Sequence, residues 1–522
     1  MNILGLGGLI NDPACTIVKS GTLAAVIEQK KIARRHETGA LPAEAIATAL
    51  ELARLSPEQI DCVALVRPFA SGPESEIHLS LRELFPKGQL VLVEHHAAHA
   101  ASAYYASAFT EATVLTLDRI GDFRCGARWE ANGNELRLQR ELYYPDSLGD
   151  LYGRVTELLG FHGNADEHKV QWLSTAGPDD LRPIFEEILG VAAGDWPRID
   201  RSFFDSDRLS HGGFSQKFYG RLGLEDNSPV PASMQPLVAA GLQRAIESTV
   251  LHMAGTAPKL CLAGGLGFNA LLVSALEREK DVFVQPMAGN AGTSLGGALY
   301  AWHTVYQEAA RVPLGDLCFG PSYSAQDIKQ VLENCKLRFR YFAMMDDLVA
   351  NAVKQLNDQK IIAWMQGRME AGPRALGNRS ILASPLNPYS TENLNVFIKH
   401  REPFRKFAAS VPAELASEYF ETGANARFLA TVGHVKPAHR KTFESAILGR
   451  DLVRVHAVNR EDNPLYHRLL HVAGETTGLP VLYNTSFNLF GDPLVCTPRD
   501  AVRSFYSSGV DALFAGNFML EK

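Results

Sequence analysis

Two glycine-rich stretches decide the fold: LAGGLGFN (262–269) and QPMAGNAGTSLGGAL (285–299). Each follows a short apolar strand, predicted at Lys259–Leu262 and Val282–Val284, and each leads into a helix. The order strand, glycine turn, helix puts helix N-terminal amides where they can hold a phosphate group. Two such turns close together favour a nucleotide cleft, although tight packing of helix on sheet would also need glycine. Neither turn is a P-loop, because the pattern GxxxxGK[ST] does not occur in the chain.

Upstream of these turns, a strand–turn–strand pattern occurs twice. The six predicted strands are Asn2–Leu6, Cys15–Val18, Leu23–Ile27, Val114–Leu117, Cys125–Trp129 and Glu135–Leu142. Helical patterns follow both sets, including a long apolar-periodic helix over Pro236–Ala254. The repetition predicts a duplicated α/β unit, with coincidence as the alternative on this ground alone.

A connecting segment rich in Gly and Pro (312–327) precedes a second alternation of helices and strands, with a helix over Leu348–Leu356 and a strand over Ile361–Met365. We therefore predict two domains, residues 1–330 and 340–522. A length of 522 residues is consistent with this division.

Composition excludes several function classes. The net charge of −7 offers no overall electrostatic footprint for nucleic acid or an anionic membrane. No apolar run approaches 18 residues, and the N-terminus has no secretory pattern. The seven cysteines are scattered without CxxC pairs. We expect a cytoplasmic enzyme with reduced thiols and without a nucleic-acid or membrane partner.

A metal site is predicted at EHHAAHAASAYY (94–105). In a helix, His95 and His99 project from one face, as two ligands of one ion require, and His96 points elsewhere. Asp118, at the end of the next strand, is a natural oxygen ligand. Imidazole with carboxylate suits Fe(II), Mn(II) or Zn(II). An accidental i, i+4 histidine pair is the alternative interpretation.

The C-terminal region carries a local positive charge. Between Ile361 and Ser410 there are seven Lys or Arg residues, Arg379 among them, against three acidic residues. We predict that they lie in loops, GRMEAGPRALGNRS and KHREPFRKF, where guanidinium groups can converge on a phosphate or carboxylate. A solvated basic face is the alternative. Farther on, NTSFN (484–488) follows an apolar strand predicted at Leu479–Tyr483 and is suited to line a pocket.

On these motifs the chain resembles the O-carbamoyltransferases of nodulation-factor and antibiotic biosynthesis. The matching stretches are HHAAHAASAYY (95–105), TLDRIGD (116–122), EHKVQWLS (167–174), LAGGLGFN (262–269), QPMAGNAGTSLGGAL (285–299), QGRMEAGPRALGNRSILASP (366–385), IKHREPFRKFAASV (398–411) and GLPVLYNTSFN (478–488). They run in order over almost the whole chain. The resemblance implies a duplicated N-terminal domain of the actin-like ATPase type, related to TsaD, and a YrdC-like α/β C-terminal domain.

The resemblance also implies a reaction in two stages. Carbamoyl phosphate and ATP give carbamoyl adenylate, and the carbamoyl group then passes to a hydroxyl of a small-molecule acceptor. ATP and carbamoyl phosphate are thus the expected co-substrates, with Fe(II) the leading metal candidate and Mg or Mn as alternatives. A homodimer is the working expectation for the assembly.

The family's functional residues map onto this chain one by one. The metal ligands correspond to His95, His99 and Asp118, with Asn290 in the fourth ligand position. Lys169 matches the lysine of the E-x-K-V motif. Gly264, Gly265 and Asn269 match the adenylate-binding loop. The residues that match the carbamoyl phosphate pocket are Arg374, Lys399, Arg405, Arg454, Asn484 and Ser486.

Several positions depart from the family pattern. The fourth metal ligand is usually Asp, and Asn290 removes one negative charge. A histidine near the first turn is replaced by Asn11, a phosphate-contacting lysine by His36 or Arg35, and a glycine by Trp172. The departures cluster on the adenylate side. They leave open the alternative that the protein is a diverged, non-catalytic or partner-dependent homologue that binds carbamoyl phosphate or nucleotide. Acceptor contacts are expected from 192–227, without a recognisable code for the acceptor.

Overall fold

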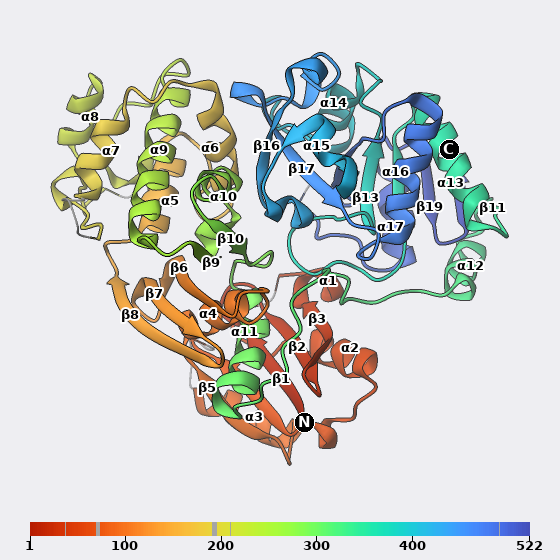
Figure 1. The fold of residues 1–522 in the computed structure, drawn as a ribbon, viewed down its shortest axis with the longest axis horizontal. Coiled ribbons are helices and arrows are strands. Elements are labelled where there is room, and N and C mark those ends of the chain that lie inside the picture. The colour runs from red at the N-terminus through yellow and green to blue at the C-terminus, as the bar shows by residue number, and fades with distance from the viewer. Residues whose placement is uncertain (37, 69–73, 191–195, 209, 490) are drawn as a thin grey trace.

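The computed structural model describes residues 1–522 except 37, 69–73, 191–195, 209 and 490. Its strands form three sheets. Two five-stranded sheets belong to the first 300 residues, and one ten-stranded mixed sheet belongs to the C-terminal part (Figure 1). The protein is thus a mixed α/β fold, as the sequence predicts.

The first sheet has the strand order β3-β2-β1-β4-β5. Its strands are β1 (Asn2–Gly7), β2 (Ala14–Lys19), β3 (Thr22–Glu28), β4 (Cys62–Val66) and β5 (Gln89–Val93). The first three pair antiparallel, and β4 and β5 extend the sheet in parallel from β1. Three helices accompany it: α1 (Gln29–Ala33), α2 (Ala43–Ala53) and α3 (Glu74–Leu84).

The second sheet repeats this topology, because its order read from the opposite edge is β8-β7-β6-β9-β10. The strands are β6 (Glu111–Gly121), β7 (Arg124–Asn132), β8 (Glu135–Tyr143), β9 (Lys259–Ala263) and β10 (Asp281–Val284). Again three antiparallel strands are followed by two parallel ones. The duplication predicted from the strand–turn–strand pattern is therefore present in the pairing.

Helices α4 (His95–Tyr104) and α11 (Gly292–Tyr300) pack closely against each other. A Cβ added at Gly296 would lie 1.8 Å from the carbonyl oxygen of Ala98 in α4, so only glycine permits this approach. Part of the second glycine-rich stretch therefore serves helix packing. The other helices of this half are α5 (Leu148–Leu158), α6 (Glu167–Leu173), α7 (Arg182–Leu189), α8 (Gln216–Leu222), α9 (Gln235–Ala254) and α10 (Ala270–Glu277).

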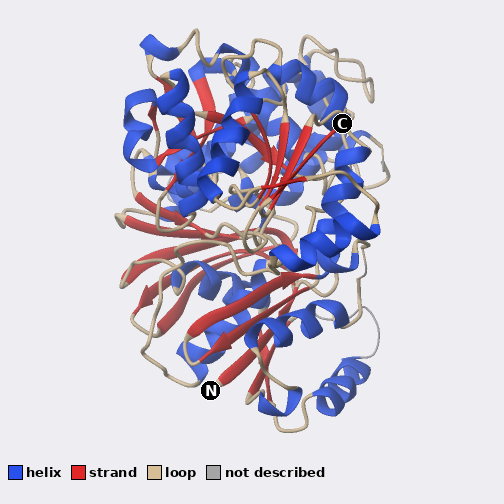
Figure 2. Cartoon of the chain, turned by 90° about the vertical axis from the view of Figure 1, so that its right-hand side faces the viewer, coloured by secondary structure: helices blue, strands red, loops and turns tan. Residues whose placement is uncertain are grey.

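The third sheet has the order β11-β20-β19-β12-β13-β18-β14-β17-β16-β15. Its strands are β11 (Arg340–Tyr341), β12 (Ile362–Met365), β13 (Arg379–Ala383), β14 (Ala408–Pro412), β15 (Phe420–Glu421), β16 (Val432–Val435), β17 (Leu452–Val458), β18 (Leu482–Ser486), β19 (Ala512–Ala515) and β20 (Phe518–Glu521). Helices cover the twisted sheet (Figure 2): α12 (Ala325–Asn334), α13 (Met345–Asn357), α14 (Ser390–Asn393), α15 (Ala416–Tyr419), α16 (Pro464–Thr477) and α17 (Pro498–Tyr506).

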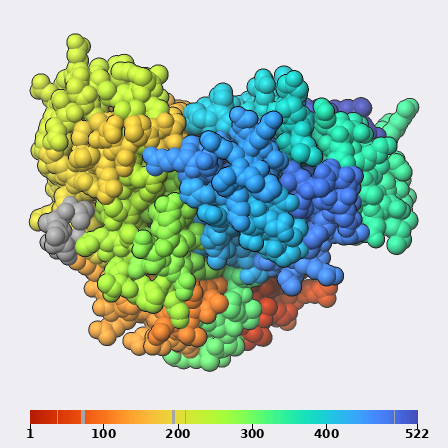
Figure 3. Space-filling model, turned by 45° about the horizontal axis from the view of Figure 1, so that its top comes forward, coloured from red at the N-terminus to blue at the C-terminus, as the bar shows by residue number. Residues whose placement is uncertain are grey.

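The C-terminal part packs against the helices that follow β8, and the two form one continuous surface (Figure 3). Ile328 and Leu332 of α12 lie in the core of the third sheet, so this helix packs with the C-terminal strands. All seven cysteines are free, as the sequence predicts. None of the helices in the described ranges is long and apolar enough to span a membrane.

Candidate functional site

Two imidazoles and one carboxylate converge where α4 meets β6. Glu94 caps α4 by accepting hydrogen bonds from the amides of His96 and Ala97. The helix starts there, so His95 and His99 share one face. Their Nε2 atoms lie 3.0 and 3.2 Å from the same oxygen, Oδ2 of Asp118. The structure thus brings together the three residues for which the sequence predicts a metal site.

The protonation states of this cluster suit a cation. Burial alone would raise the pKa of the Asp118 carboxyl, but hydrogen bonds from His95 and His99 hold it well below its usual range. Burial lowers the pKa of His99 despite its contact with Asp118. An ionised carboxylate and a neutral imidazole are the forms that bind divalent metals. Among the described residues, Nδ1 of His99 has no hydrogen-bond partner.

Asn290 contributes a further oxygen to this region. It lies just before α11 and lines the same cavity as Asp118. Its side-chain Oδ1 is buried without a hydrogen-bond partner among the described residues, an arrangement that costs free energy unless a ligand fills it. A donor set of two histidines, one carboxylate and one amide oxygen would fit a divalent transition metal.

His96 has no part in this cluster. Its ring is fully buried, with Nδ1 2.9 Å from the Thr116 hydroxyl and Nε2 3.1 Å from the carbonyl oxygen of Arg124. Burial lowers the pKa of the imidazole well below its usual value. Both nitrogens are engaged in the core, so His96 is a structural residue, as its predicted direction in the helix implies.

A cavity of about 740 Å³ opens beside Asp118. Among the residues that the sequence singled out, Asn11, Asp118, Gly265, Asn269 and Asn290 line it. It therefore collects side chains from both halves of the duplicated unit. This is the space in which a nucleotide would have to lie if the glycine turns hold phosphate.

The first glycine-rich turn approaches β6 closely. Gly264 has a φ of +90°, and a Cβ there would lie 2.2 Å from the carbonyl oxygen of Leu117. Its amide donates to the Ala288 carbonyl, so the backbone N–H is already engaged. A Cβ at Gly265 would lie 3.1 Å from Oδ1 of Asp118. The turn thus brings backbone next to the metal cluster.

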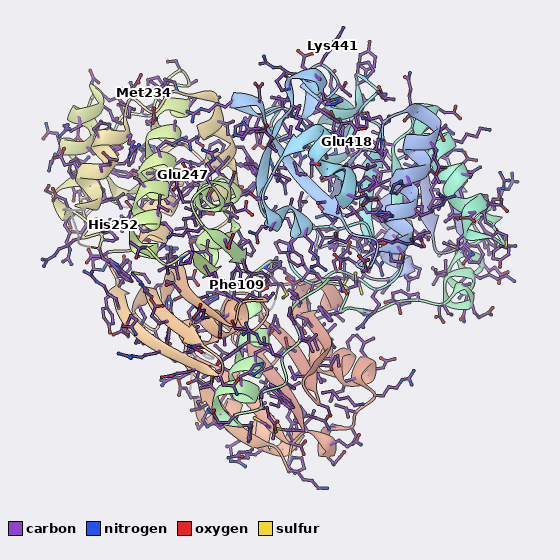
Figure 4. The ribbon with its side chains drawn as sticks, viewed as in Figure 1. Phe109, Met234, Glu247, His252, Glu418 and Lys441 are labelled. Carbon is purple, nitrogen blue, oxygen red and sulfur yellow. The ribbon has the colours of Figure 1, made fainter. Side chains whose placement is uncertain are left out.

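Asn269 is held by several partners. Its Oδ1 accepts from the Leu272 amide and caps α10, and its Nδ2 donates to Oε1 of Gln243. Gln243 also donates to Glu247 on α9 (Figure 4). The side chain of Asn269 is therefore rigid, and it forms one wall of the cavity.

Lys169 bridges the N-terminal and C-terminal parts. Its Nζ lies 3.2 Å from Oδ2 of Asp166 and 2.8 Å from Oε1 of Glu402. Two carboxylates neutralise this lysine, and it does not line the large cavity. With these two ion pairs, Lys169 connects the two domains.

His168, next to Lys169, is a cavity residue that the sequence reasoning missed. Burial and the nearby charges of Arg405 and Arg374 lower its pKa to about 4. Nδ1 lies 3.1 Å from the Ala165 carbonyl oxygen, which leaves Nε2 without a partner among the described residues. His168 occupies the variable position of the E-x-K-V motif. Its place between Glu167 and Lys169 is the sequence signal that would have pointed to it.

Two residues predicted for the carbamoyl phosphate pocket lie on the strands that flank β14. Ala408 of β14 pairs with Arg454 on β17 and with Asn484 on β18, so the arginine and the amide stand on opposite sides of one strand. Nδ2 of Asn484 donates to the Ala375 carbonyl oxygen, and its Oδ1 is buried without a partner in the described structure. Ala375 follows Arg374 in the GPRALGNRS loop.

The cations of this pocket repel one another. Burial and the charges of Arg374, Arg401 and Arg405 hold the pKa of Arg454 well below its usual range. Burial and Arg405 lower the pKa of Arg374 to about 10. In the described residues no ion pair involves Arg374, Lys399 or Arg454. Guanidinium groups without carboxylate partners are suited to bind an anion, because a bound dianion would remove the repulsion.

Lys399 and Ser486, two further residues predicted for the pocket, contact each other. Nζ of Lys399 donates to the carbonyl oxygens of Ser486 and Asn488 and to Oδ1 of Asn488, at 2.5, 3.1 and 2.7 Å. The prediction that NTSFN follows a strand at Leu479–Tyr483 is wrong. The strand is Leu482–Ser486, so Asn484 and Ser486 lie within it and point to the same face.

Two other expectations for basic residues are wrong. Arg379 lies in β13, fully buried, and donates to the carbonyl oxygens of Gln366 and Asn378 instead of joining the pocket. His36 and Arg35 are exposed and do not line the cavity, so neither replaces a phosphate-contacting lysine. Their neighbour Lys31 reaches the Glu370 carbonyl oxygen across the domain interface. Glu37 lies outside the described residues.

The region assigned to the acceptor is described in part, since 192–195 and 209 lie outside the described residues. Arg208, Gly212 and Gly213 line a smaller cavity of about 180 Å³. Arg119 and Asn164 line this cavity and the large one as well. The segment therefore lies next to the candidate site.

Family models for the two halves of one enzyme family match this chain. A carbamoyltransferase N-terminus model matches residues 76–299, and a carbamoyltransferase C-terminus model matches residues 353–522. The chain belongs to the carbamoyltransferase family. It is an enzyme of this class, and the glycine-rich turns, the histidine cluster and the cationic pocket all lie within the matched ranges.

Two relatives cover nearly the whole chain, and a third covers about half of it. The nodulation protein NolNO of Sinorhizobium fredii is 31% identical over 98% of this chain and 79% of its own length. A Synechocystis protein is 30% identical over 100% of this chain and 97% of that protein. The 3'-hydroxymethylcephem-O-carbamoyltransferase of Amycolatopsis lactamdurans is 29% identical over 49% of this carbamoyltransferase and 48% of its own length.

Proposed function

We propose that this carbamoyltransferase transfers a carbamoyl group from carbamoyl phosphate to a small-molecule hydroxyl in an ATP-dependent reaction. One observation carries the proposal: His168 lines the cavity that holds Asp118, and the charges of Arg374 and Arg405 depress the pKa of its imidazole. The cavity beside Asp118 and the arginines of the cationic pocket therefore both lie close to His168. An intermediate made at one site would then pass to the other near His168.

The proposed reaction balances in three steps. Water cleaves carbamoyl phosphate into carbamate and inorganic phosphate. A carbamate oxygen attacks the α-phosphorus of ATP, which gives carbamoyl adenylate and releases pyrophosphate. The acceptor hydroxyl then attacks the carbamoyl carbon, the bond to AMP breaks, and the hydroxyl proton is lost.

The cationic pocket would serve the first step, the cleavage of carbamoyl phosphate. Arg374, Arg405 and Arg454 would neutralise the phosphate and the charge that develops as carbamate leaves. The buried, unpartnered Oδ1 of Asn484 would accept a hydrogen bond from the carbamoyl NH₂ group. Burial and the charges of Arg401 and Arg405 hold the pKa of Lys399, which donates to oxygens of Ser486 and Asn488, well below its usual range. A bound anion would favour the charged form of this lysine.

The cavity beside Asp118 would hold the adenylate. We propose that the repeated strand order of the first two sheets makes this half an actin-like ATPase module, with the cleft between its halves as the nucleotide site, and that the C-terminal sheet is the YrdC-like module. A divalent metal on His95, His99, Asp118 and Asn290, with Fe(II) the leading candidate, would supply Lewis acidity toward phosphate oxygens.

Carbamoyl adenylate formation in the absence of acceptor tests this proposal. Purified protein is incubated with carbamoyl phosphate, ATP and Fe(II) or Mn(II), and pyrophosphate and the adenylate are followed by mass spectrometry. We expect pyrophosphate release that depends on carbamoyl phosphate and disappears in Arg454→Met. The exposed Arg440, which pairs with Asp451, provides the matched control Arg440→Met. A metal-loaded protein that binds carbamoyl phosphate but releases no pyrophosphate would overturn the proposal.

A further inference from the structure

A second histidine pair repeats the geometry of the first, on the C-terminal domain. His467 and His471 stand four residues apart on α16, and Glu414 lies just after β14. Nε2 of His467 and Nε2 of His471 lie 2.9 and 2.8 Å from the same oxygen, Oε1 of Glu414. In the first cluster the corresponding distances to Oδ2 of Asp118 are 3.0 and 3.2 Å.

The spacing of these three atoms is close to that of ligands around one metal ion. Zinc bonds to imidazole nitrogen and carboxylate oxygen are about 2.0–2.2 Å long, so ligand atoms of one tetrahedral ion are about 3.3 Å apart. The three ligand atoms here all lie within 4.8 Å of one another. Small movements of the side chains would admit an ion between them, and the i, i+4 spacing on one helix keeps both imidazoles aimed at it.

The surroundings leave room for water ligands. The three side chains line an open cavity of about 750 Å³. The Glu414 side chain is 52% exposed, and His467 and His471 are 11% and 33% exposed. The cavity also carries charges of both signs. Arg460 and Arg468 line it, but so do Glu461 and Glu475, and Arg468 lies 3.4 Å from Glu475 and 3.8 Å from Asp346.

We propose that Glu414, His467 and His471 bind one divalent transition metal of the Zn²⁺ class, at a site separate from the His95–His99–Asp118 cluster. Two imidazoles and a carboxylate, with remaining positions left to water, form an open three-ligand site. The inference does not depend on the proposed carbamoyl chemistry, because the site lies on the other domain.

A metal here would clamp two elements that border the cationic pocket. Glu414 follows β14, whose Ala408 lies between Arg454 and Asn484. Asn463, which caps α16, donates to Oδ1 of Asn378 in the GPRALGNRS loop. An ion that joins Glu414 to α16 would therefore tie β14 to the helix that holds this loop.

Metal titration of the full chain tests the proposal. The protein is stripped with chelator and titrated with Co(II), and binding is read from d–d absorption and from metal content after gel filtration. The His99→Ala variant, which lacks a ligand of the first cluster, isolates the second site. In this background we expect one Co(II) per chain, with affinity reduced by more than about tenfold in His471→Asn.

A matched control is His36→Asn, which changes an exposed histidine on the other domain and leaves the binding unchanged. His467→Asn serves as a second ligand variant if His471→Asn fails to fold, and circular dichroism checks the fold of each. The proposal is overturned if His99→Ala binds no Co(II), or if the folded ligand variants bind it as tightly as their parent.

Discussion

The guanidinium carbon of Arg454 lies 5.4 Å from the centre of the Trp172 indole ring. Arg454 belongs to the C-terminal sheet and Trp172 to α6 of the N-terminal half, so this cation–π contact crosses the domain interface. Trp172 also packs with Ala270, Leu271, Leu448 and Leu452. Trp172, at a position where the family resemblance implies glycine, therefore lies against an arginine of the predicted pocket and contacts both domains.

We expect Trp172→Gly to loosen this interface. Removal of a buried tryptophan costs about 3–5 kcal/mol, because apolar contacts are lost and a cavity remains. The thermal midpoint should fall, and phosphate should bind more weakly, because Arg454 loses its contact with the indole ring. Trp172→Phe, which keeps an aromatic face, should retain most of both properties. An unchanged midpoint in the glycine variant would show that the interface does not depend on this side chain.

Inorganic phosphate should stabilise the wild-type protein through the cationic pocket. A ligand at one hundred times its Kd adds about 2.7 kcal/mol to the free energy of unfolding. We expect Arg454→Met to remove this response while the midpoint without phosphate stays equal or rises, because Arg374, Arg401 and Arg405 then repel one charge fewer. Differential scanning fluorimetry with and without phosphate measures both. A phosphate response that survives in Arg454→Met but is absent in Arg440→Met would place the anion elsewhere.

Metal binding at the first cluster should depend on His99 and not on His96. His99→Ala removes a ligand atom, so bound metal should drop from about one ion per chain to near zero at that site. His96→Gln disturbs a buried hydrogen-bonded residue, which lowers stability but keeps the ligands in place. Metal analysis in a His471→Asn background separates the two sites. Equal metal loss in both variants would contradict the assignment.

Asn290→Asp should strengthen metal binding. A carboxylate in place of the unpartnered amide oxygen adds a negative charge beside the cation, which we expect to raise affinity on the order of tenfold or more, or about 1.4 kcal/mol. Asn164→Asp adds the same charge to another wall of the same cavity and provides the matched control. Calorimetric titration with Mn(II) compares the three proteins. A stronger gain in the control would indicate a general charge effect.

Stability should fall in mild acid because two histidines are held neutral. Burial lowers the pKa of His456 from 6.5 to about 3, and burial with Arg405 lowers that of His168 to about 4. Below about pH 6.5 the unfolded chain binds these protons while the folded protein does not. Each histidine then removes about 1.4 kcal/mol per pH unit, down to its folded pKa.

The thermal midpoint, measured from pH 7.5 to pH 5, checks this dependence. His456→Gln keeps a hydrogen-bonding group toward Ser410 but has no proton to gain, so its midpoint should decline less steeply. His36→Gln, at an exposed position, should follow the wild type. A His456→Gln profile as steep as the wild type would assign the acid sensitivity to other groups.

Local sequence determined the elements whose signals are local. The glycine-rich turns, the strands Asn2–Gly7 and Lys259–Ala263, and the i, i+4 histidines on α4 follow from periodicity and spacing, which act over a few residues. Strand β18 begins and ends three residues later than the sequence predicts, because polar Asn484 and Ser486 do not carry the apolar pattern of a strand. Its pairing with β13 and β14 decides where it lies.

Only the tertiary structure decided which charges meet. Seven basic residues between 361 and 410 predict a positive region, but burial turned Arg379 into a core residue, and the domain interface paired Lys169 with Glu402. His168 and the Glu414–His467–His471 cluster depend on segments far apart in the chain. The sequence by itself determined the fold class, the family resemblance and the donor residues. Long-range packing decided their partners, because desolvation and charge proximity depend on distance in space and not along the chain.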